Sequence, residues 1–322
     1  MFYFIENNQY KAVYTVSGGI LQNQKVETYE NAMKFSEFAL SEAKRNGKNS
    51  CYVFNQDDYE KYLRKRELNR TMHHAVKHDF RGFEVYFQPL IQSENRQLCG
   101  AEALLRFRTP DGERISPAEF VPILEESGLI IPVGRWVFRR ALETCLEWQK
   151  YIPDFKININ LSYVQVLKSR VQQEILQMVK ELGINPACVC VELTESGYLE
   201  ENPHFTKLWN GLKEHGISLA LDDFGTGYSN LHCLCDLRPS CVKIDRTFIN
   251  KALNRDYEYQ LLRYIIEMAH SLELAVCVEG IESEEELDKV QKTGPNLIQG
   301  YLFGKPCCKE EFFQSFFPEL AR

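Results

Sequence analysis

The chain has 322 residues, of which 44% are hydrophobic and 26% charged, an ordinary balance for a globular protein that excludes wholesale disorder. The 38 Lys and Arg residues against 45 Asp and Glu residues give a formal net charge of -7. This charge argues against a general binder of duplex nucleic acid. The sequence shows neither a signal-peptide pattern nor a membrane-spanning run, so we expect no membrane segment. The eleven cysteines lie mostly in apolar segments and predict a reduced, cytoplasmic chain.

The first 81 residues predict two pieces that differ in composition. Residues 1–56 predict a small α/β segment, with a β-rich run over 10–21, a helix over 28–46 and a short strand over 51–54. This segment is marginal in size for an independent domain. Residues 57–81 are highly charged, and 57–80 contain neither Pro nor Gly, so they predict a linker helix.

Residues 82–322 follow a regular pattern in which short β-like runs mostly alternate with helical stretches. We count eight such runs, over 83–90, 99–107, 155–162, 189–195, 218–225, 241–248, 274–281 and 297–304. Helical periodicity lies between several of them, over 133–151, 164–182 and 258–272. A short polar turn joins the first two runs and predicts an antiparallel pair. The pattern therefore predicts an α/β fold, a modified (β/α)8 TIM-type barrel with one antiparallel strand.

Polar residues interrupt strands that a barrel should fill with apolar side chains. They are Gln88, Glu102, Asn160, Glu192, Asp222, Asp223, Lys243, Glu279 and Gln299. Buried carboxylates are costly unless they are paired or bound to metal. In a barrel, the ends of the strands converge on one rim, where active sites are built. We therefore expect these side chains to form one site.

The donor atoms of this set predict a particular kind of metal. Five carboxylates and one amide offer hard oxygen ligands, and neither His nor Cys joins them. Such ligands favour Mg²⁺ or Mn²⁺ over zinc or copper. Five carboxylates suggest two cations that share a ligand, the usual arrangement for in-line displacement at phosphorus. Lys243 would stay charged beside the carboxylates and orient the attacking water or stabilise the transition state.

The adjacent Asp222 and Asp223 present a geometric difficulty. Neighbouring residues of a strand point to opposite faces of the sheet. Both carboxylates can therefore reach one site only if the strand ends there. The following Gly225-Thr226-Gly227 predicts this break.

Seven motifs in order resemble the EAL-domain cyclic di-GMP phosphodiesterases, over about Phe83 to Phe317. They are EALLRF (102–107), NLS (160–162), ELTES (192–196), DDFGTGYS (222–229), KID (243–245), EGIE (279–282) and QGYLFGKP (299–306). The resemblance implies a barrel with an antiparallel strand that hydrolyses cyclic di-GMP to linear pGpG with two Mg²⁺ or Mn²⁺ ions. It also implies a homodimer through the barrel.

The resemblance assigns a role to each matching residue. It implies that one metal ion is held by Glu102, Asn160, Glu192 and Asp222. Asp222 and Asp223 would serve the second ion, with a water held by Lys243, and Glu279 would be a further metal or water-orienting carboxylate. The resemblance implies substrate contacts from Gln88, Leu104, Arg106, Gln299 and Pro306, with Gln299 near the water or metal. Glu195 would anchor the DDFGTGYS loop, which contributes to dimers of the family.

The segment over residues 1–56 resembles, more weakly, the C-terminal portion of a GGDEF diguanylate cyclase domain. The resemblance rests on VYTVSGGI (13–20) and EFALSEAKRNGKNSCYVF (37–54). The signature GGDEF loop is missing, so we expect no cyclase site. Two other functions stay open for the chain as a whole. One is a catalytically silent cyclic di-GMP receptor, and the other is an interaction module that uses the barrel surface and the linker helix.

Overall fold

The structure is a computed structural model that describes residues 2–7, 10–22, 28–194, 203–225, 234 and 237–317. It divides into two compact units, Met1–Thr71 and Met72–Arg322. The division falls inside helix α2 (Gln56–Lys77), which occupies the position of the predicted linker helix. None of the described helices is long and apolar enough to cross a bilayer.

In its described residues, the first unit contains two pairs of strands, one complete helix and the greater part of α2. Strands β1 (Phe2–Asn7) and β2 (Tyr10–Thr15) form an antiparallel hairpin, and β3 (Gly18–Ile20) pairs in parallel with β4 (Cys51–Val53). The single β run predicted over residues 10–21 is therefore two strands. Helix α1 (Tyr29–Arg45) connects β3 to β4, and Thr28 caps its first turn. Phe38 and Phe54 form the buried centre of this unit, with Tyr59 of α2 packed against them.

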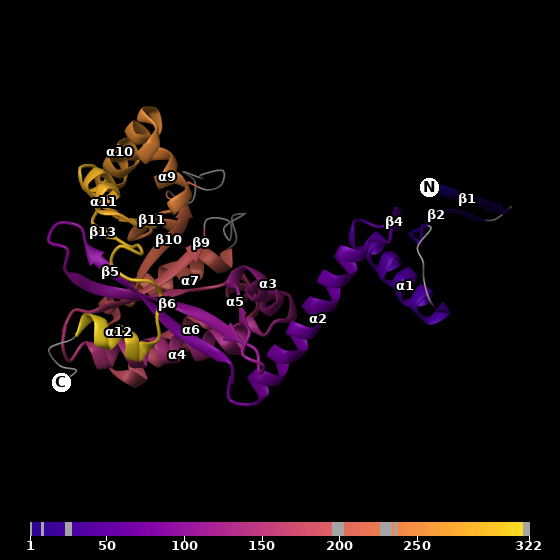
Figure 1. The fold of residues 1–322 in the computed structure, drawn as a ribbon, viewed down its shortest axis with the longest axis horizontal. Helices are drawn as coiled ribbons and strands as arrows, with labels where there is room; N and C mark the ends of the chain where they lie inside the picture. The colour runs from indigo at the N-terminus through magenta and orange to yellow at the C-terminus, as the bar shows by residue number, and fades with distance from the viewer. Residues whose placement is uncertain are drawn as a thin grey trace. The chain divides into compact units, whose positions relative to one another are not determined.

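The second unit is a closed barrel of eight strands (Figure 1). The strands are β5 (Phe83–Gln92), β6 (Leu98–Arg108), β8 (Lys156–Asn160), β9 (Val189–Thr194), β10 (Ser218–Phe224), β11 (Cys241–Ile244), β12 (Ala275–Val278) and β13 (Leu297–Ile298). Strand β5 closes the barrel because it pairs with both β6 and β13, and it is antiparallel to both. The other barrel neighbours pair in parallel. The predicted TIM-type barrel with one antiparallel strand is confirmed.

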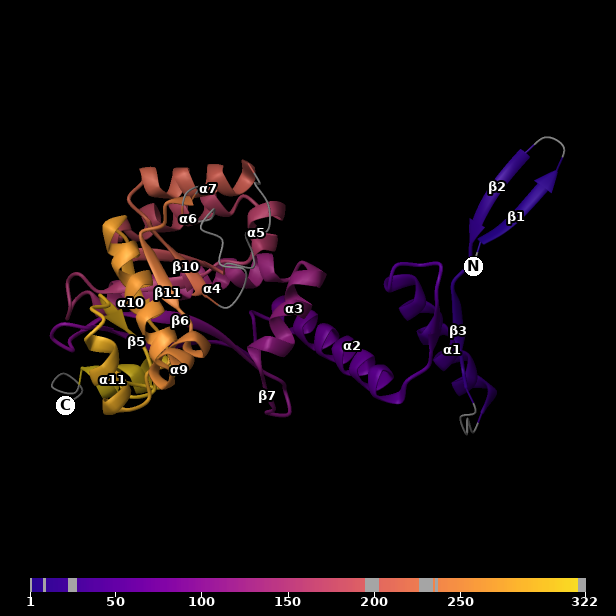
Figure 2. The same cartoon turned by 90° about the horizontal axis from the view of Figure 1, so that it is seen from above.

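Helices surround the barrel strands in both views (Figures 1 and 2). They are α3 (Pro117–Ser127), α4 (Ile130–Trp148), α5 (Tyr163–Lys168), α6 (Val171–Leu182), α7 (Pro203–Glu214), α9 (Arg246–Asn254), α10 (Asp256–Ser271), α11 (Glu284–Gln291) and α12 (Lys309–Phe316). A short 3-10 turn, η1 (Pro186–Cys188), precedes β9, and strand β7 (Arg114–Ile115) extends the sheet beside β6.

Several boundaries differ from the sequence prediction. The β run expected over 297–304 is a strand only over Leu297–Ile298. Two other differences have a local cause. The helix expected over 164–182 is divided into α5 and α6, because Ser169 leaves the helical conformation with φ -135° and ψ 177°. The β run expected over 241–248 ends at Ile244. The side chain of Asp245 accepts a hydrogen bond of 2.7 Å from the backbone N–H of Thr247, so it caps α9 and ends the strand.

An aromatic cluster fixes two helices against β5. Trp148 of α4 stacks on Phe312 of α12 at 4.4 Å, and Phe87 of β5 meets the Trp148 ring edge-on at 4.9 Å. All three side chains are buried. Because neighbouring residues of a strand point to opposite faces, this packing turns Gln88 toward the barrel interior.

Candidate active site

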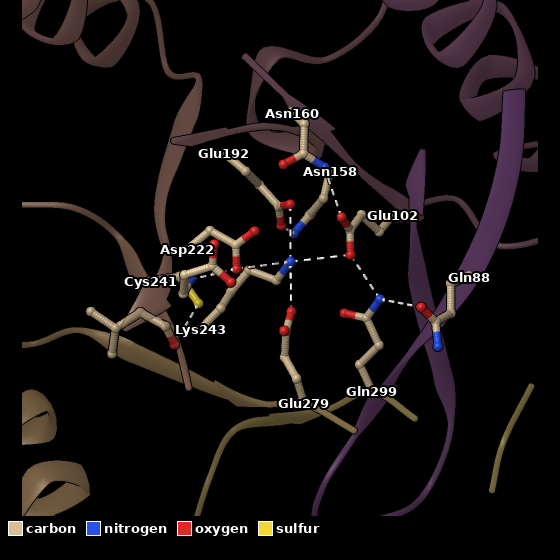
Figure 3. A network of polar contacts seen from close by, with 12 residues as sticks. Gln88, Glu102, Asn158, Asn160, Glu192, Asp222, Cys241, Lys243, Glu279 and Gln299 are labelled. Carbon is tan, nitrogen blue, oxygen red and sulfur yellow. Dashed lines mark hydrogen bonds and ion pairs between the residues drawn. The ribbon is translucent and has the colours of Figure 1, made fainter. Parts of the chain in front are cut away.

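Lys243 is the centre of the polar network inside the barrel (Figure 3). Its Nζ lies 3.1 Å from Glu102 Oε2, 3.0 Å from Glu192 Oε2, 3.5 Å from Asp222 Oδ1 and 2.7 Å from Glu279 Oε1. The Lys243 side chain is only 1% exposed. Because its ammonium group is buried and contacts four carboxylates, Lys243 does not simply extend its side chain to solvent.

These carboxylates come from strands far apart in the sequence that the barrel makes neighbours. Glu102 lies on β6, Glu192 on β9 and Asp222 on β10, and Glu279 directly follows β12. Lys243 lies on β11, between β10 and β12. The tertiary structure therefore brings together the set that the sequence predicted from isolated polar residues.

A β-bulge explains how the adjacent Asp222 and Asp223 both belong to this region. In the pairing of β10 with β11, Leu221 faces Val242 and Phe224 faces Ile244, so two aspartates stand opposite Lys243 alone. Asp223 has φ +58°, in the left-handed region, and its N–H donates to Asp222 Oδ1 at 2.9 Å. Strand β10 ends at Phe224, directly before the predicted break at Gly225, whose φ is +93°, and the backbone already turns within the strand at Asp223.

Burial and the contacts with neighbouring side chains act in opposite directions on the pKa values of the carboxylates. Burial raises the pKa of Glu192 well above its ordinary value, and with the nearby Asp222 and Glu102 charges it raises the pKa of Glu279 to about 8 despite Lys243. For Glu102, burial favours the neutral acid, but Lys243 and the side chains of Gln299 and Asn160 outweigh it and lower the pKa. Burial would also neutralise Lys243, yet the surrounding carboxylates hold its pKa well above the usual value.

Amide side chains orient Glu102. Asn160 Nδ2 donates to Glu102 Oε1 at 2.7 Å, and Gln299 Nε2 donates to Glu102 Oε2 at 2.7 Å. Gln299 Nε2 also donates to Gln88 Oε1 at 3.0 Å, so both predicted glutamines lie at the site. The Oε1 atom of Gln299 is buried without a hydrogen-bond partner among the described residues. It therefore needs a donor or cation that the described residues do not supply.

The site fits a divalent cation. Glu102, Glu192 and Asp222 each offer an oxygen, and these oxygens lie within 4.8 Å of one another. If these three carboxylates and Glu279 were all ionised, Lys243 would neutralise only one of their four negative charges. Their joint ionisation therefore requires further positive charge. Asn160 adds an amide beside Glu102. Oxygen donors of this type match Mg²⁺ or Mn²⁺.

Asp223 is the neighbour of Asp222 but is not among the three carboxylates whose oxygens lie within 4.8 Å of one another. Burial, with the nearby Asp222 and Asp245 carboxylates, raises its pKa to about 6. Glu195, the predicted loop anchor, lies outside the described residues, as does Thr226–Ser229 of the DDFGTGYS motif.

Two cavities open beside the carboxylates, and both are lined by Leu104. One, of about 280 Å³, is also lined by Gln88, Glu102, Asp222, Lys243, Arg246, Glu279, Gly280, Glu282, Gln299, Gly300 and Tyr301. The other, of about 540 Å³, is mainly apolar and includes Arg106 and Asn160 in its wall. Pro306 lines neither cavity among the described residues, so its predicted substrate contact has no geometric support here.

The sequence prediction missed two features of the site. Arg246 and Glu282 form an ion pair on the wall of the smaller cavity. Asn158 is buried and donates to Glu192 Oε1 at 2.7 Å. The sequence could have indicated Asn158 as a site residue. It lies two residues before Asn160, and residues i and i+2 of a strand share a face.

Known proteins share this fold and sequence. The EAL domain family matches residues 69–306. The chain is 30% identical over 276 residues to the cyclic di-GMP phosphodiesterase PdeR of Escherichia coli, covering 85% of this chain and 41% of PdeR. It is 33% identical over 274 residues to the uncharacterized protein sll1895 of Synechocystis, covering 85% of this chain and 39% of that protein. The chain thus spans about two fifths of the length of these relatives.

Solved structures agree with the barrel. The PaMucR phosphodiesterase in complex with c-di-GMP has a TM-score of 0.71 and 30% identity, covering 76% of this chain and 99% of that one. The EAL enzyme Bd1971, with cAMP and cyclic di-GMP bound, has a TM-score of 0.76 and 27% identity, covering 90% of this chain and 77% of that one. The family match covers well over half of the sequence. This chain belongs to the EAL domain family.

Proposed function

We propose that this chain hydrolyses cyclic di-GMP to linear pGpG and so lowers the level of this second messenger in bacterial signalling. The observation that carries the proposal is the convergence of four carboxylates, three of them buried, on Lys243 in a barrel of the EAL family. Relatives at about 30% identity include a cyclic di-GMP phosphodiesterase and a phosphodiesterase with bound c-di-GMP. A complete carboxylate set favours the enzyme over a silent receptor.

The reaction would depend on two Mg²⁺ or Mn²⁺ ions. Glu102, Asn160, Glu192 and Asp222 would hold one ion, and Asp222 with Asp223 would serve the second. When bound, such ions lower the pKa of water and neutralise phosphate charge. The buried triad and the unpartnered Gln299 Oε1 support a cation at this place.

The chain's own groups would position water and substrate. Lys243 and Glu279, which form a 2.7 Å ion pair, would orient the attacking water on one side of the phosphorus. The water oxygen would bond to phosphorus and lose a proton as the P–O3′ bond breaks. The leaving O3′ would take up a proton, so the product pGpG has a 5′-phosphate and a free 3′-hydroxyl. Substrate contacts are assigned to Gln88, Leu104, Arg106, Gln299 and, on the resemblance alone, Pro306. Arg106 is well placed for a phosphate or base because it lines the 540 Å³ cavity, 5.7 Å above the Tyr86 ring.

The test is incubation of the purified chain with cyclic di-GMP and Mn²⁺ or Mg²⁺, with nucleotides separated by chromatography. We expect pGpG, and we expect EDTA to stop its formation. Binding of cyclic di-GMP without product would select the receptor function. Partner capture that persists in Glu102→Ala, without nucleotide turnover, would select the interaction module.

Further assignments concern the rest of the chain. We propose that residues 1–56 are a partial GGDEF-like segment without a cyclase site, that 57–81 are a linker and that 82–322 are the catalytic barrel. The β3–α1–β4 order is compatible with this division. The nine described cysteines are free thiols, in keeping with a cytoplasmic location. We also propose that Glu195 anchors the DDFGTGYS loop.

We also propose a homodimer through the barrel. Helix α10 exposes Tyr257, Leu261 and Tyr264 at intervals of four and three residues, which places them on one helical face. A second copy would cover this face. Light scattering of Tyr264→Glu against the unchanged chain tests the proposal, and an unchanged molar mass would contradict it.

A further inference from the structure

Asn158 makes a contact that no other described side chain duplicates. Its Nδ2 donates a hydrogen bond of 2.7 Å to Oε1 of Glu192, and both residues are buried, Glu192 completely (Figure 3). Asn158 lies on β8 in register with Glu102 on one side and with Cys190 on the other. The amide therefore reaches the carboxylate from the neighbouring strand, inside the barrel.

The two oxygens of Glu192 are held differently. Oε2 lies 3.0 Å from Lys243 Nζ, but this ammonium also contacts three other carboxylates. A group shared among four partners does not by itself fix the orientation of any one of them. Among the described residues of the network, the Asn158 side chain donates to Glu192 alone. It determines which way the carboxylate plane faces.

We propose that Asn158 is a positioning residue that holds Glu192 in the orientation needed to bind a divalent cation together with Glu102 and Asp222. The proposal rests on the metal assignment of the proposed function. Glu192 contributes one of the three oxygens that lie within 4.8 Å of one another. Hydrogen bonds to metal-ligating carboxylates orient the ligand, and their loss typically weakens metal affinity 10–100-fold.

A purely structural role makes a different prediction. If Asn158 only filled space, replacing it by an apolar side chain of similar size would preserve the cation site. Asn158→Val removes the donor and keeps most of the volume, whereas Asn158→Ala removes both. Ile157→Val is the matched control, because Ile157 is buried on the same strand and points to the opposite face.

The experiment is a titration of the full chain with Mn²⁺ alone, followed by the loss of the free Mn²⁺ signal in electron paramagnetic resonance. We expect both Asn158 variants to bind Mn²⁺ about tenfold more weakly than the unchanged chain, and Ile157→Val to bind it normally. Circular dichroism confirms that each variant is folded. Saturating Mn²⁺ should restore most of the turnover lost in Asn158→Val.

The outcomes separate this proposal from the proposed function. Unchanged Mn²⁺ affinity in both Asn158 variants, or an equal loss in Ile157→Val, overturns the positioning role while cyclic di-GMP hydrolysis still stands. Weaker Mn²⁺ binding in the variants of a chain that does not hydrolyse cyclic di-GMP supports the positioning role and removes the phosphodiesterase assignment. A chain that binds no Mn²⁺ at this site overturns the positioning role, whatever its activity.

Discussion

Lys243 Nζ lies 2.7 Å from Glu279 Oε1, the shortest of its four contacts with carboxylates. The two residues come from adjacent parallel strands, since Glu279 directly follows β12 and Lys243 lies on β11. Both side chains are less than one fifth exposed. The ammonium group at the centre of the network thus has its shortest contact with the carboxylate that directly follows β12.

Replacing Lys243 by Met should destabilise the metal-free protein. Four carboxylates would then face one another without the ammonium, and breaking a buried ion network typically costs about 3–5 kcal/mol. Urea unfolding in EDTA measures the loss. Lys309→Met is the control, because the Lys309–Glu147 pair is partly exposed and should contribute less than about 1 kcal/mol. Equal losses in the two variants would contradict the central role of Lys243.

Glu102→Gln should abolish turnover and also lower stability. Both Glu102 oxygens accept hydrogen bonds, from Asn160 on one side and from Lys243 and Gln299 on the other. A glutamine would turn an NH₂ group toward one of these donors, at a cost of about 1–3 kcal/mol. Glu84 of β5, which is partly exposed and lies outside this network, supplies the control, Glu84→Gln. Pairing urea unfolding with the pGpG assay checks both expectations, and full activity in Glu102→Gln would refute the ligand assignment.

Metal affinity should rise with pH. Asp223 has a pKa of about 6 and Glu279 of about 8, each raised chiefly by burial, and a protonated carboxylate is a poor ligand. Mn²⁺ binding should therefore strengthen from pH 6 to pH 8 and release protons. Calorimetry in two buffers of different ionisation enthalpy measures the proton release. A pH-independent affinity would disagree with these pKa values.

The free energy of unfolding of the metal-free protein should fall from pH 6 to pH 8, whereas metal affinity should rise. The pKa of Glu279 rises on folding from 4.5 to about 8, so its contribution is fully present below about pH 4.5 and is lost as the pH rises toward 8. In EDTA, the protein should have a lower melting temperature at pH 8 than at pH 6. In Glu279→Gln this difference should shrink, and a difference of unchanged size would exclude Glu279 as its source.

Gly300→Ala should disturb the site through the backbone. A Cβ at Gly300 would lie 2.0 Å from the Ile281 carbonyl oxygen and 2.4 Å from its nitrogen, so the segment after Gln299 would have to move. We expect a loss of about 1–3 kcal/mol in urea unfolding, together with reduced turnover. At Gly294 a Cβ meets nothing within 4 Å, although φ is +79°. Gly294→Ala should therefore lower stability through backbone strain and leave turnover unchanged.

The sequence by itself determined the barrel, its antiparallel first strand and most of the polar site. These followed because apolar runs of strand length and helical stretches alternate along the chain, and because residues such as Glu102 and Lys243 interrupt strands that should be apolar. Such signals are local in sequence, so they can be recognised without knowing which strands become neighbours.

The tertiary structure alone decided how those residues act together. The bulge that places Asp222 and Asp223 opposite Lys243 depends on the register of β10 with β11, and the hydrogen bond from Asn158 to Glu192 depends on that of β8 with β9. Register and side-chain orientation arise when the barrel closes. The protonation of Glu279 likewise depends on burial among charges that lie far apart in the chain.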